Sequence, residues 1–269
     1  MVAESGDWPW PVPPTEPPGR GLLDGRRVVV TAAAGTGIGS AVARRALIEG
    51  ARVLISDTHE RRLSATLDRL EAETGSRPEA VRCDVTAESD VQALMDSAVN
   101  LLGGVDVMMN NAGLGGSARL VDMTDEQWSA VLNVTLDGTM RCTRAALRLM
   151  IDQATGGAIV NNASVVGWRA QVEQAHYAAA KAGVMALTRC AALEAAEHGI
   201  RVNCVAPSLA WHPFLAKTAD EALLDDLAAK EAFGRPAEPW EVANVMVFLS
   251  SDLSGYMTGE VVSVSSQHP

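Results

Sequence analysis

Three side chains in the second half of the sequence are of the types that can move a proton to or from an oxygen atom. Tyr177 and Lys181 stand four residues apart in an alanine-rich run that favours a helix, so both project from one face. Ser164 precedes Tyr177 by 13 residues and follows a short apolar run. A tyrosine with its usual pKa of about 10 is a poor acid or base at neutral pH, but a nearby lysine charge favours the phenolate. A serine hydroxyl can hold a substrate oxygen, although Tyr-x-x-x-Lys taken alone is more often surface decoration.

A second candidate site lies near the start of the chain, where residues 28–40 read VVVTAAAGTGIGS. Gly35, Gly37 and Gly39 alternate just before a helical run, and the N-terminus of a helix offers unpaired N–H groups to a phosphate. Asp57 ends the next apolar run, 18 residues after Gly39. That spacing suits a carboxylate that accepts hydrogen bonds from an adenosine ribose. On local grounds, an Asp57 that only caps the following helix stays open as an alternative.

The elements that must position these residues alternate between strand and helix. The sequence predicts strands at 26–31, 51–57, 80–85, 105–113, 157–164, 200–208 and 259–266. It predicts helices at 38–50, 59–73, 88–102, 125–151, 175–198, 214–231 and 239–250. Continuously apolar strands separated by single helices indicate a parallel sheet with helices on both faces. In such a sheet a ligand binds at the carboxyl ends of the strands.

Composition narrows the class of protein. The chain has 269 residues, 48% of them hydrophobic, and a formal net charge of −11. That charge argues against nucleic acid or an anionic membrane as a partner. No apolar run approaches the roughly 20 residues of a membrane span, and the first residues lack the pattern of a secretory signal. The four cysteines, Cys83, Cys142, Cys190 and Cys204, are scattered, so we expect reduced core thiols, no metal site and a cytoplasmic protein.

The first 21 residues form a proline-rich extension. Half of the 12 prolines lie within residues 1–19, so this segment is not expected to join a helix or a central strand. The simplest interpretation is a flexible or polyproline-like tail. The alternative is that Trp8 and Trp10 dock on a neighbouring subunit or over the active site.

Taken together, these features resemble the short-chain dehydrogenase/reductase family, in the form related to 3-oxoacyl-carrier-protein reductases and hydroxysteroid dehydrogenases. The resemblance covers about residues 22–266. Its motifs are CDVT at 83–86, NNAG at 110–113, YAAAK at 177–181, RVNCVAP at 201–207 and the segment 234–264. It implies one Rossmann-fold domain at 22–269, a seven-stranded parallel sheet of order 3-2-1-4-5-6-7, and a substrate-binding loop at about 208–233.

The resemblance also implies roles for individual residues. Tyr177 is then the acid–base, Lys181 lowers its pKa and holds the nicotinamide ribose, and Ser164 positions the substrate oxygen. Thr135 stands where the family has a fourth catalytic residue, asparagine. The implied cofactor-binding residues are Gly35, Thr36, Gly37, Ile38, Gly39, Asp57, Asp84, Val85, Asn111, Ala112, Gly113, Tyr177, Lys181, Pro207, Leu209 and His212.

Four departures from the family pattern stand out. The glycine loop has Ala32 in place of the first glycine and one extra residue, and we expect the site to be intact because Gly35 and Gly37 supply flexible points. In the family a water links the lysine to the main-chain carbonyl at the position of Thr135, so threonine preserves that carbonyl while losing the amide. His212 replaces a threonine that meets the carboxamide. The last strand ends in SSQ instead of DGG, which puts the subunit contact there in doubt.

The substrate pocket of the family falls on Trp168, Gln171, Trp211 and Phe214. The chain has only 11 aromatic residues, so three in this set favour a wide apolar pocket for a bulky ligand, although each also fits an ordinary core position. A steroid or a steroid-derived acyl-CoA is expected, since the chain looks similar to actinobacterial members from steroid-ring breakdown. Two alternatives stay open: a fatty-acid-type 3-oxoacyl reductase, and a non-catalytic dinucleotide-binding sensor or structural subunit.

The expected cofactor is NAD. The loop residues 33–36 carry no charge, and Asp57 places a carboxylate where the 2′-phosphate of NADP would sit. Arg61 and Arg62 are the counter-argument, and we expect both to point to solvent. The family pairs helices 125–151 and 175–198 across a two-fold axis, which predicts a homotetramer.

Overall fold

The structure, a computed structural model, describes residues 10–211 and 221–266. Its strands form one parallel sheet in the order β3-β2-β1-β4-β5-β6-β7, as the sequence predicts. The strands are β1 (Arg27–Val30), β2 (Arg52–Asp57), β3 (Glu79–Arg82), β4 (Val107–Asn110), β5 (Gly157–Asn162), β6 (Ile200–Pro207) and β7 (Val261–Val264). The helices are α1 (Ile38–Ile48), α2 (Glu60–Thr74), α3 (Glu88–Leu102), α4 (Asp125–Leu132), α5 (Gly138–Gln153), α6 (Ala175–Ala195), α8 (Glu221–Ala229) and α9 (Pro239–Ser250). Shorter helical turns are η1 (Asn133–Asp137), η2 (Val165–Gly167), η3 (Ala196–His198) and η4 (Asp252–Ser254).

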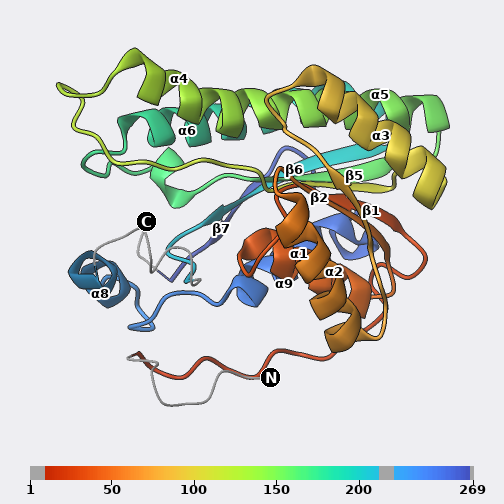
Figure 1. Cartoon of the computed structure of the whole chain (residues 1–269), viewed down its shortest axis with the longest axis horizontal. Helices are drawn as coiled ribbons and strands as arrows, with labels where there is room; N and C mark the ends of the chain where they lie inside the picture. Colours follow the sequence, from red (N-terminus) through yellow and green to blue (C-terminus); the bar gives the residue numbers. More distant parts are fainter. Residues whose placement is uncertain (1–9, 212–220, 267–269) are drawn as a thin grey trace.

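Helices cover both faces of the sheet (Figure 1). Helices α1, α2 and α9 pack on one face, and α3, α5 and α6 pack on the other. Side chains alternate between the two faces along each strand. Val28 and Val30 belong to the core under α1 and α9, whereas Val29 belongs to the core under α3 and α5. This double coverage explains why the strands read as continuous apolar runs.

Two helix boundaries show how local sequence fixes the elements. Helix α9 has proline at its first turn and a reciprocal capping box between Glu238 and Glu241. Helix α3 ends where Gly103 takes a left-handed conformation, with a φ of 85°. Both helices have the predicted bounds. Of the helix predicted at 214–231, residues 212–220 lie outside the described residues, and α8 forms the described part.

The helix predicted at 125–151 runs through residues 125–153 as α4, η1 and α5 in direct succession. A π-helical turn, η1, separates α4 from α5 and contains Thr135. The predicted helix is therefore present, and its π turn was not predicted because such a turn adds a residue to the helical repeat without interrupting the helix.

The N-terminal segment, residues 10–20, has no helix or strand, as its prolines predict. It nevertheless packs on α1, since the Arg45 guanidinium donates hydrogen bonds to the carbonyls of Pro17 and Pro18. Figure 1 shows this segment running beneath α1 and α9 toward the side of α8. Residues 10–20 are therefore bound to α1 and do not form a free tail.

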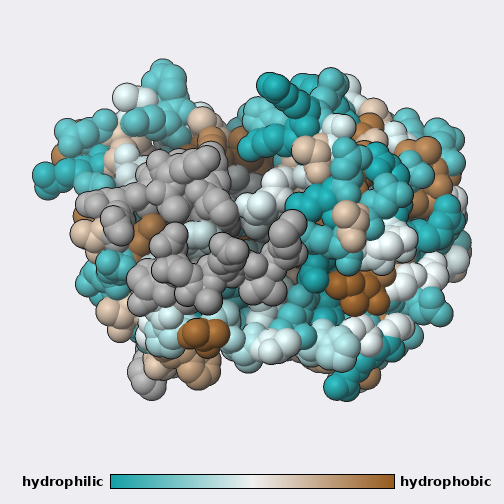
Figure 2. All heavy atoms as spheres, turned by 60° about the horizontal axis from the view of Figure 1, so that its bottom comes forward, coloured by the Kyte–Doolittle hydropathy of each residue, from teal (hydrophilic) through white to brown (hydrophobic). Residues whose placement is uncertain are grey.

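The surface and the cysteines bear on the class of protein that composition predicts. Figure 2 shows a mainly hydrophilic face on which apolar residues form separate small groups. Cys83, Cys142 and Cys204 are buried thiols as expected, but Cys190 is exposed, which corrects its assignment to the core. Within residues 10–211 and 221–266, no helix combines the length and apolar character needed to cross a bilayer.

Candidate active site

The predicted site residues gather at one edge of the sheet. Strands β1, β4, β5 and β6 are neighbours, so the residues that follow them lie side by side. Thr31 follows β1, Asn111 follows β4, Ser164 lies just beyond β5, and Pro207 ends β6. The Ser164 Oγ donates to the Pro207 carbonyl at 3.5 Å, a direct link across this edge.

Tyr177 and Lys181 lie in α6, one turn apart, with the lysine Nζ 5.5 Å from the centre of the tyrosine ring. Burial raises the pKa of Tyr177 to about 12, and a hydrogen bond with Ser164 acts in the opposite direction. Burial lowers the pKa of Lys181 to about 8. Each charge is costly alone in this interior, so an anionic Tyr177 and a cationic Lys181 would stabilise each other.

Asn162 holds the lysine in place, a role that the sequence interpretation missed. The Lys181 Nζ donates to the Asn162 carbonyl at 2.6 Å. The Asn162 side chain donates to the Asn111 Oδ1 at 2.9 Å, and the Asn111 amide donates to the Ala32 carbonyl at 3.1 Å. The ends of β5, β4 and β1 are thus joined by two asparagines. The only sequence signal was the position of Asn162 at the end of the strand before Ser164.

Thr135 is buried and uses its hydroxyl. Its Oγ1 accepts a hydrogen bond from the Leu114 N–H at 3.0 Å and donates to the Leu114 carbonyl at 3.2 Å. Its carbonyl accepts a hydrogen bond from the Thr139 hydroxyl at 2.7 Å. A Cβ atom built on Gly113 would lie 3.5 Å from the Lys181 Nζ and 3.9 Å from the Thr135 Oγ1. Gly113 therefore marks a point that lysine and threonine both approach.

The glycine loop between β1 and α1 was predicted to bind the phosphates of a dinucleotide. Ala32 takes a left-handed conformation with a φ of 50°. Glycine adopts this conformation readily, which explains why the family usually has glycine at this position. A Cβ on Gly39 would lie 2.4 Å from the Ala32 carbonyl oxygen, so only glycine fits where α1 meets the loop. Helix α1 follows Gly37, its N-cap residue, and has no side-chain cap and no acidic residue in its first turn. Its free N–H groups fit the pyrophosphate of a dinucleotide.

Asp57 binds the loop and also precedes α2. Its carboxylate accepts hydrogen bonds from the Ala34 N–H at 3.3 Å and the His59 N–H at 3.1 Å. Burial raises its pKa, and the charge of Arg62 acts against that shift. The expectation that Arg62 points to solvent is wrong: its guanidinium lies 3.5 Å from the Asp57 Oδ1. The long arginine side chain reaches back over the first turn of α2 to the nearest buried carboxylate.

Other predicted residues flank this centre or lie outside the described part of the chain. The Asp84 carboxylate accepts hydrogen bonds from the backbone N–H and the hydroxyl of Thr86, and these bonds lower its pKa. Val85 is buried beside Gly138. Trp168, Gln171 and Trp211 follow β5 and β6 at the site edge, with Trp168 51% exposed. His212 and Phe214 lie outside the described residues.

A Rossmann-type sheet with serine, tyrosine and lysine at its carboxyl edge defines the class of oxidoreductase. A family model described as enoyl-(acyl carrier protein) reductase matches residues 32–266. The chain belongs to the short-chain dehydrogenase/reductase family, whose members use a nicotinamide dinucleotide. The predicted family, fold and enzyme class are confirmed.

Three relatives show how closely the chain follows this family. It is 64% identical over 258 residues to "(5R,7aS)-5-hydroxy-7a-methyl-1-oxo-2,3,5,6,7,7a-hexahydro-1H-indene-carboxyl-CoA reductase" of Mycobacterium tuberculosis, covering 96% of this chain and 98% of the relative. It is 37% identical over 242 residues to a 3-oxoacyl-[acyl-carrier-protein] reductase of Thermotoga maritima, covering 90% and 97%. A crystal structure of a short chain dehydrogenase from Mycobacterium smegmatis superposes with a TM-score of 0.85 at 60% identity, covering 95% of this chain and 98% of that one.

Proposed function

We propose that this enzyme interconverts a secondary alcohol and a ketone on a bulky, steroid-derived CoA thioester, with NAD(H) as the hydride carrier. The observation that carries the proposal is the 64% identity, over 96% of the chain, to a carboxyl-CoA reductase whose name describes a hydroxylated bicyclic ketone. Trp168 and Trp211 at the site edge supply apolar surface suited to fused rings.

The proposed roles follow from the geometry at the end of β5. The nicotinamide ring, when bound, supplies or accepts the hydride at the substrate carbon. Ser164 holds the substrate oxygen, and the Tyr177 hydroxyl transfers the proton to it or from it. Lys181, fixed by the Asn162 carbonyl, favours the phenolate electrostatically. Because burial raises the pKa of Tyr177 to about 12, its proton transfer depends on that lysine charge.

NAD over NADP is proposed from the loop between β1 and α1. Residues 33–36 are uncharged, and Asp57 lies beside Ala34, where a 2′-phosphate would meet its carboxylate. Like charges about 4 Å apart at an effective dielectric near 20 repel by roughly 4 kcal/mol. The Arg62 guanidinium offsets part of that repulsion, since it lies 3.5 Å from Asp57. We expect NAD to be preferred by roughly tenfold in kcat/KM, with Asp57→Ala narrowing the preference and Arg62→Met widening it.

A fatty-acid-type 3-oxoacyl reductase is the second candidate, supported by the 37% identity to the Thermotoga enzyme. The deciding experiment is a panel of bicyclic carboxyl-CoA thioesters, hydroxysteroids and linear 3-oxoacyl thioesters, each assayed with both dinucleotides. The proposal predicts that the bicyclic CoA thioesters give the highest kcat/KM. Preference for linear 3-oxoacyl thioesters would establish the second candidate instead.

Tyr177→Phe tests the chemistry. It removes the hydroxyl and keeps the ring, so we expect a loss of at least about 100-fold in turnover with dinucleotide binding retained. Near-normal turnover of this variant on the best substrate would show that another group moves the proton. Absence of turnover by the unmodified chain on every substrate, with dinucleotide still bound, would favour a sensor or structural subunit.

A further inference from the structure

Two side chains of helix α2 form hydrogen bonds with the backbone of Gly35 in the glycine loop. The Gly35 N–H donates to the Thr66 Oγ1 at 3.0 Å, and the Arg69 guanidinium donates to the Gly35 carbonyl at 2.8 Å. The same guanidinium also hydrogen-bonds the hydroxyl of Ser40, in the first turn of α1. Gly35 has a φ of 95°, so the clamped residue is the one that gives the lengthened loop its bend. Arg69 thus links the loop to the start of α1, and Thr66 holds the loop on α2.

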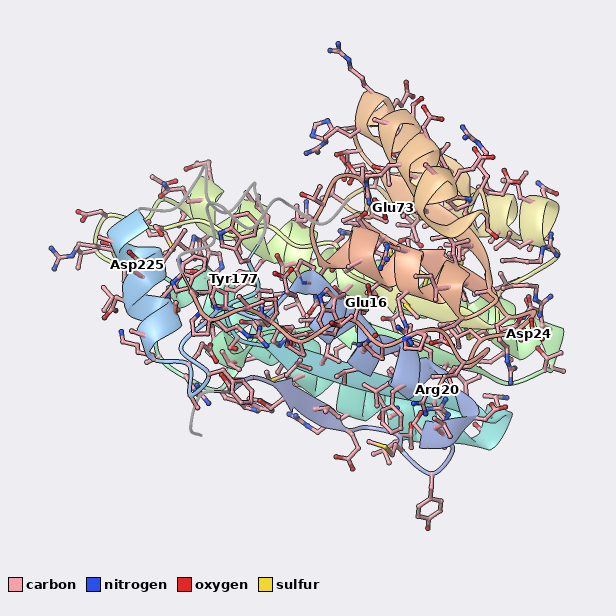
Figure 3. The ribbon with its side chains drawn as sticks, turned by 90° about the horizontal axis from the view of Figure 1, so that it is seen from below. Glu16, Arg20, Asp24, Glu73, Tyr177 and Asp225 are labelled. Atoms are coloured by element: carbon pink, nitrogen blue, oxygen red, sulfur yellow. The ribbon has the colours of Figure 1, made fainter. Side chains whose placement is uncertain are left out.

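Arg69 is itself held by a chain of alternating charges. Its guanidinium lies 3.1 Å from the Glu73 carboxylate, and Glu73 lies 3.0 Å from the Nε of Arg44 on α1. Arg44 in turn donates to Glu16 of the N-terminal segment at 2.5 Å. These side chains are only 19–34% exposed, so solvent screens the interactions less than it screens surface pairs. In Figure 3, Glu16 lies on the N-terminal segment and Glu73 at the end of α2.

The N-terminal segment is fixed at both ends of this contact. On one side, the buried Glu49 carboxylate accepts hydrogen bonds from the N–H groups of Arg20 at 2.8 Å and Leu22 at 2.9 Å. On the other side, Pro11 lies against Gly234, since a Cβ built on that glycine would be 3.8 Å from the proline ring. Glu16 is therefore presented to Arg44 by a seated segment and not by a free tail.

We propose that Arg69 is a positioning residue for the dinucleotide-binding loop, and that the N-terminal segment supports it through Glu16, Arg44 and Glu73. The physical reason is entropic. A loop with an extra residue has more conformations to lose when it closes on a pyrophosphate. Ala32 also has to be held at a left-handed φ of 50°, which alanine disfavours. A clamp that orders the loop beforehand removes that cost from binding. The proposal concerns dinucleotide binding alone, so its test needs no substrate and stands apart from the proposed function.

The test compares Arg69→Met with Arg77→Met in the full-length chain. Arg77 also forms ion pairs with two α2 carboxylates, Asp68 and Glu71. Its side chain is more exposed than that of Arg69, and the hydrogen bonds that it donates go to these carboxylates and not to the glycine loop. Dissociation constants for NAD and NADH are measured by titration, and amide hydrogen exchange is measured over residues 33–37 in the protein without dinucleotide. We expect Arg69→Met to weaken binding about tenfold and to speed exchange in the loop, with Arg69→Lys in between. Arg77→Met should change neither.

Glu16→Gln tests the support from the N-terminal segment. We expect it to weaken dinucleotide binding by about two- to threefold in the unmodified background and to have no further effect in Arg69→Met, because both act through one chain. Equal binding and equal loop exchange in Arg69→Met and the unmodified protein would overturn the proposal. Independent, multiplicative effects of the two substitutions would overturn the role of the N-terminal segment.

Discussion

The ammonium group of Lys181 lies in the protein interior, where burial disfavours its charged form. The side chain is buried, its ammonium donates to the Asn162 carbonyl, and burial lowers its pKa from 10.5 to about 8. An unfolded chain restores the ordinary pKa, so between about pH 8 and pH 10.5 the unfolded state binds more protons than the folded state. The contribution of Lys181 to folding stability must therefore rise with pH across that window.

The prediction compares the unmodified chain with Lys181→Met. The free energy of unfolding of the unmodified chain, relative to the variant, should increase by about 2 to 3 kcal/mol between pH 7 and pH 10. Taking the difference removes the titration of the other groups, including Cys204, except where they couple to Lys181. Urea unfolding of both proteins at several pH values measures it. A difference that stays flat from pH 7 to pH 10 would mean that Lys181 keeps its ordinary pKa in the fold.

At this scale, sequence reasoning predicted the candidate reacting groups but not the residues that hold them. Ser164, Tyr177 and Lys181 were predicted because their types and spacing have a chemical meaning that a sequence displays. Asn162 was missed because the lysine binds its main-chain carbonyl, which every residue possesses. Arg62 was placed wrongly because a long side chain has many rotamers, and only the packed structure shows which buried carboxylate it reaches.

At the scale of elements, the π turn η1 decides what Thr135 does. It turns the threonine hydroxyl toward Leu114, whose N–H and carbonyl it binds in the loop after β4. Apolar periodicity predicted other helices well, since α3 and α9 have the predicted bounds. Periodicity is blind to one inserted residue, however, and also to the packing of α2 on the glycine loop, which depends on contacts distant in sequence.

Thr135→Val is the matching test. Valine keeps the shape of threonine and leaves the Leu114 N–H without its partner, so we expect a loss of about 1–3 kcal/mol in the free energy of unfolding. Thr135→Ser keeps the hydroxyl and should retain most of that stability. Both are measured by urea unfolding at neutral pH. Stability of Thr135→Val equal to that of the unmodified chain would show that water or another group satisfies Leu114.

Turnover by Thr135→Val and Thr135→Ser distinguishes a structural role of the hydroxyl from a catalytic one. If the hydroxyl only orders the loop, turnover by Thr135→Val should stay within about tenfold of the unmodified enzyme. A loss on the order of 10³-fold would mean that the hydroxyl acts on the reacting groups.

On the scale of the whole molecule, exposed apolar residues on the helices indicate where subunits could associate. The helices predicted to form the subunit contact carry core residues of the single chain, since Ala145 on α5 and Met185 and Ala191 on α6 are buried. The exposed apolar side chains on these helices are different ones. Trp128 on α4 is 36% exposed, and Leu193 on α6 is 81% exposed. Burial of such residues is what a helical subunit interface would supply.

We predict a homotetramer in which α4, α5 and α6 pair across a two-fold axis. Light scattering at micromolar concentration should give about four times the 28.3 kDa mass of the chain. Leu193→Glu places a charge on the proposed interface and should lower that mass, because a desolvated, unpaired carboxylate destabilises association. Val12→Glu is the matched control, since Val12 is 87% exposed but lies on the N-terminal segment, away from these helices. A monomeric mass for the unmodified chain would contradict the prediction, and a tetramer in both variants would place the interface away from Leu193.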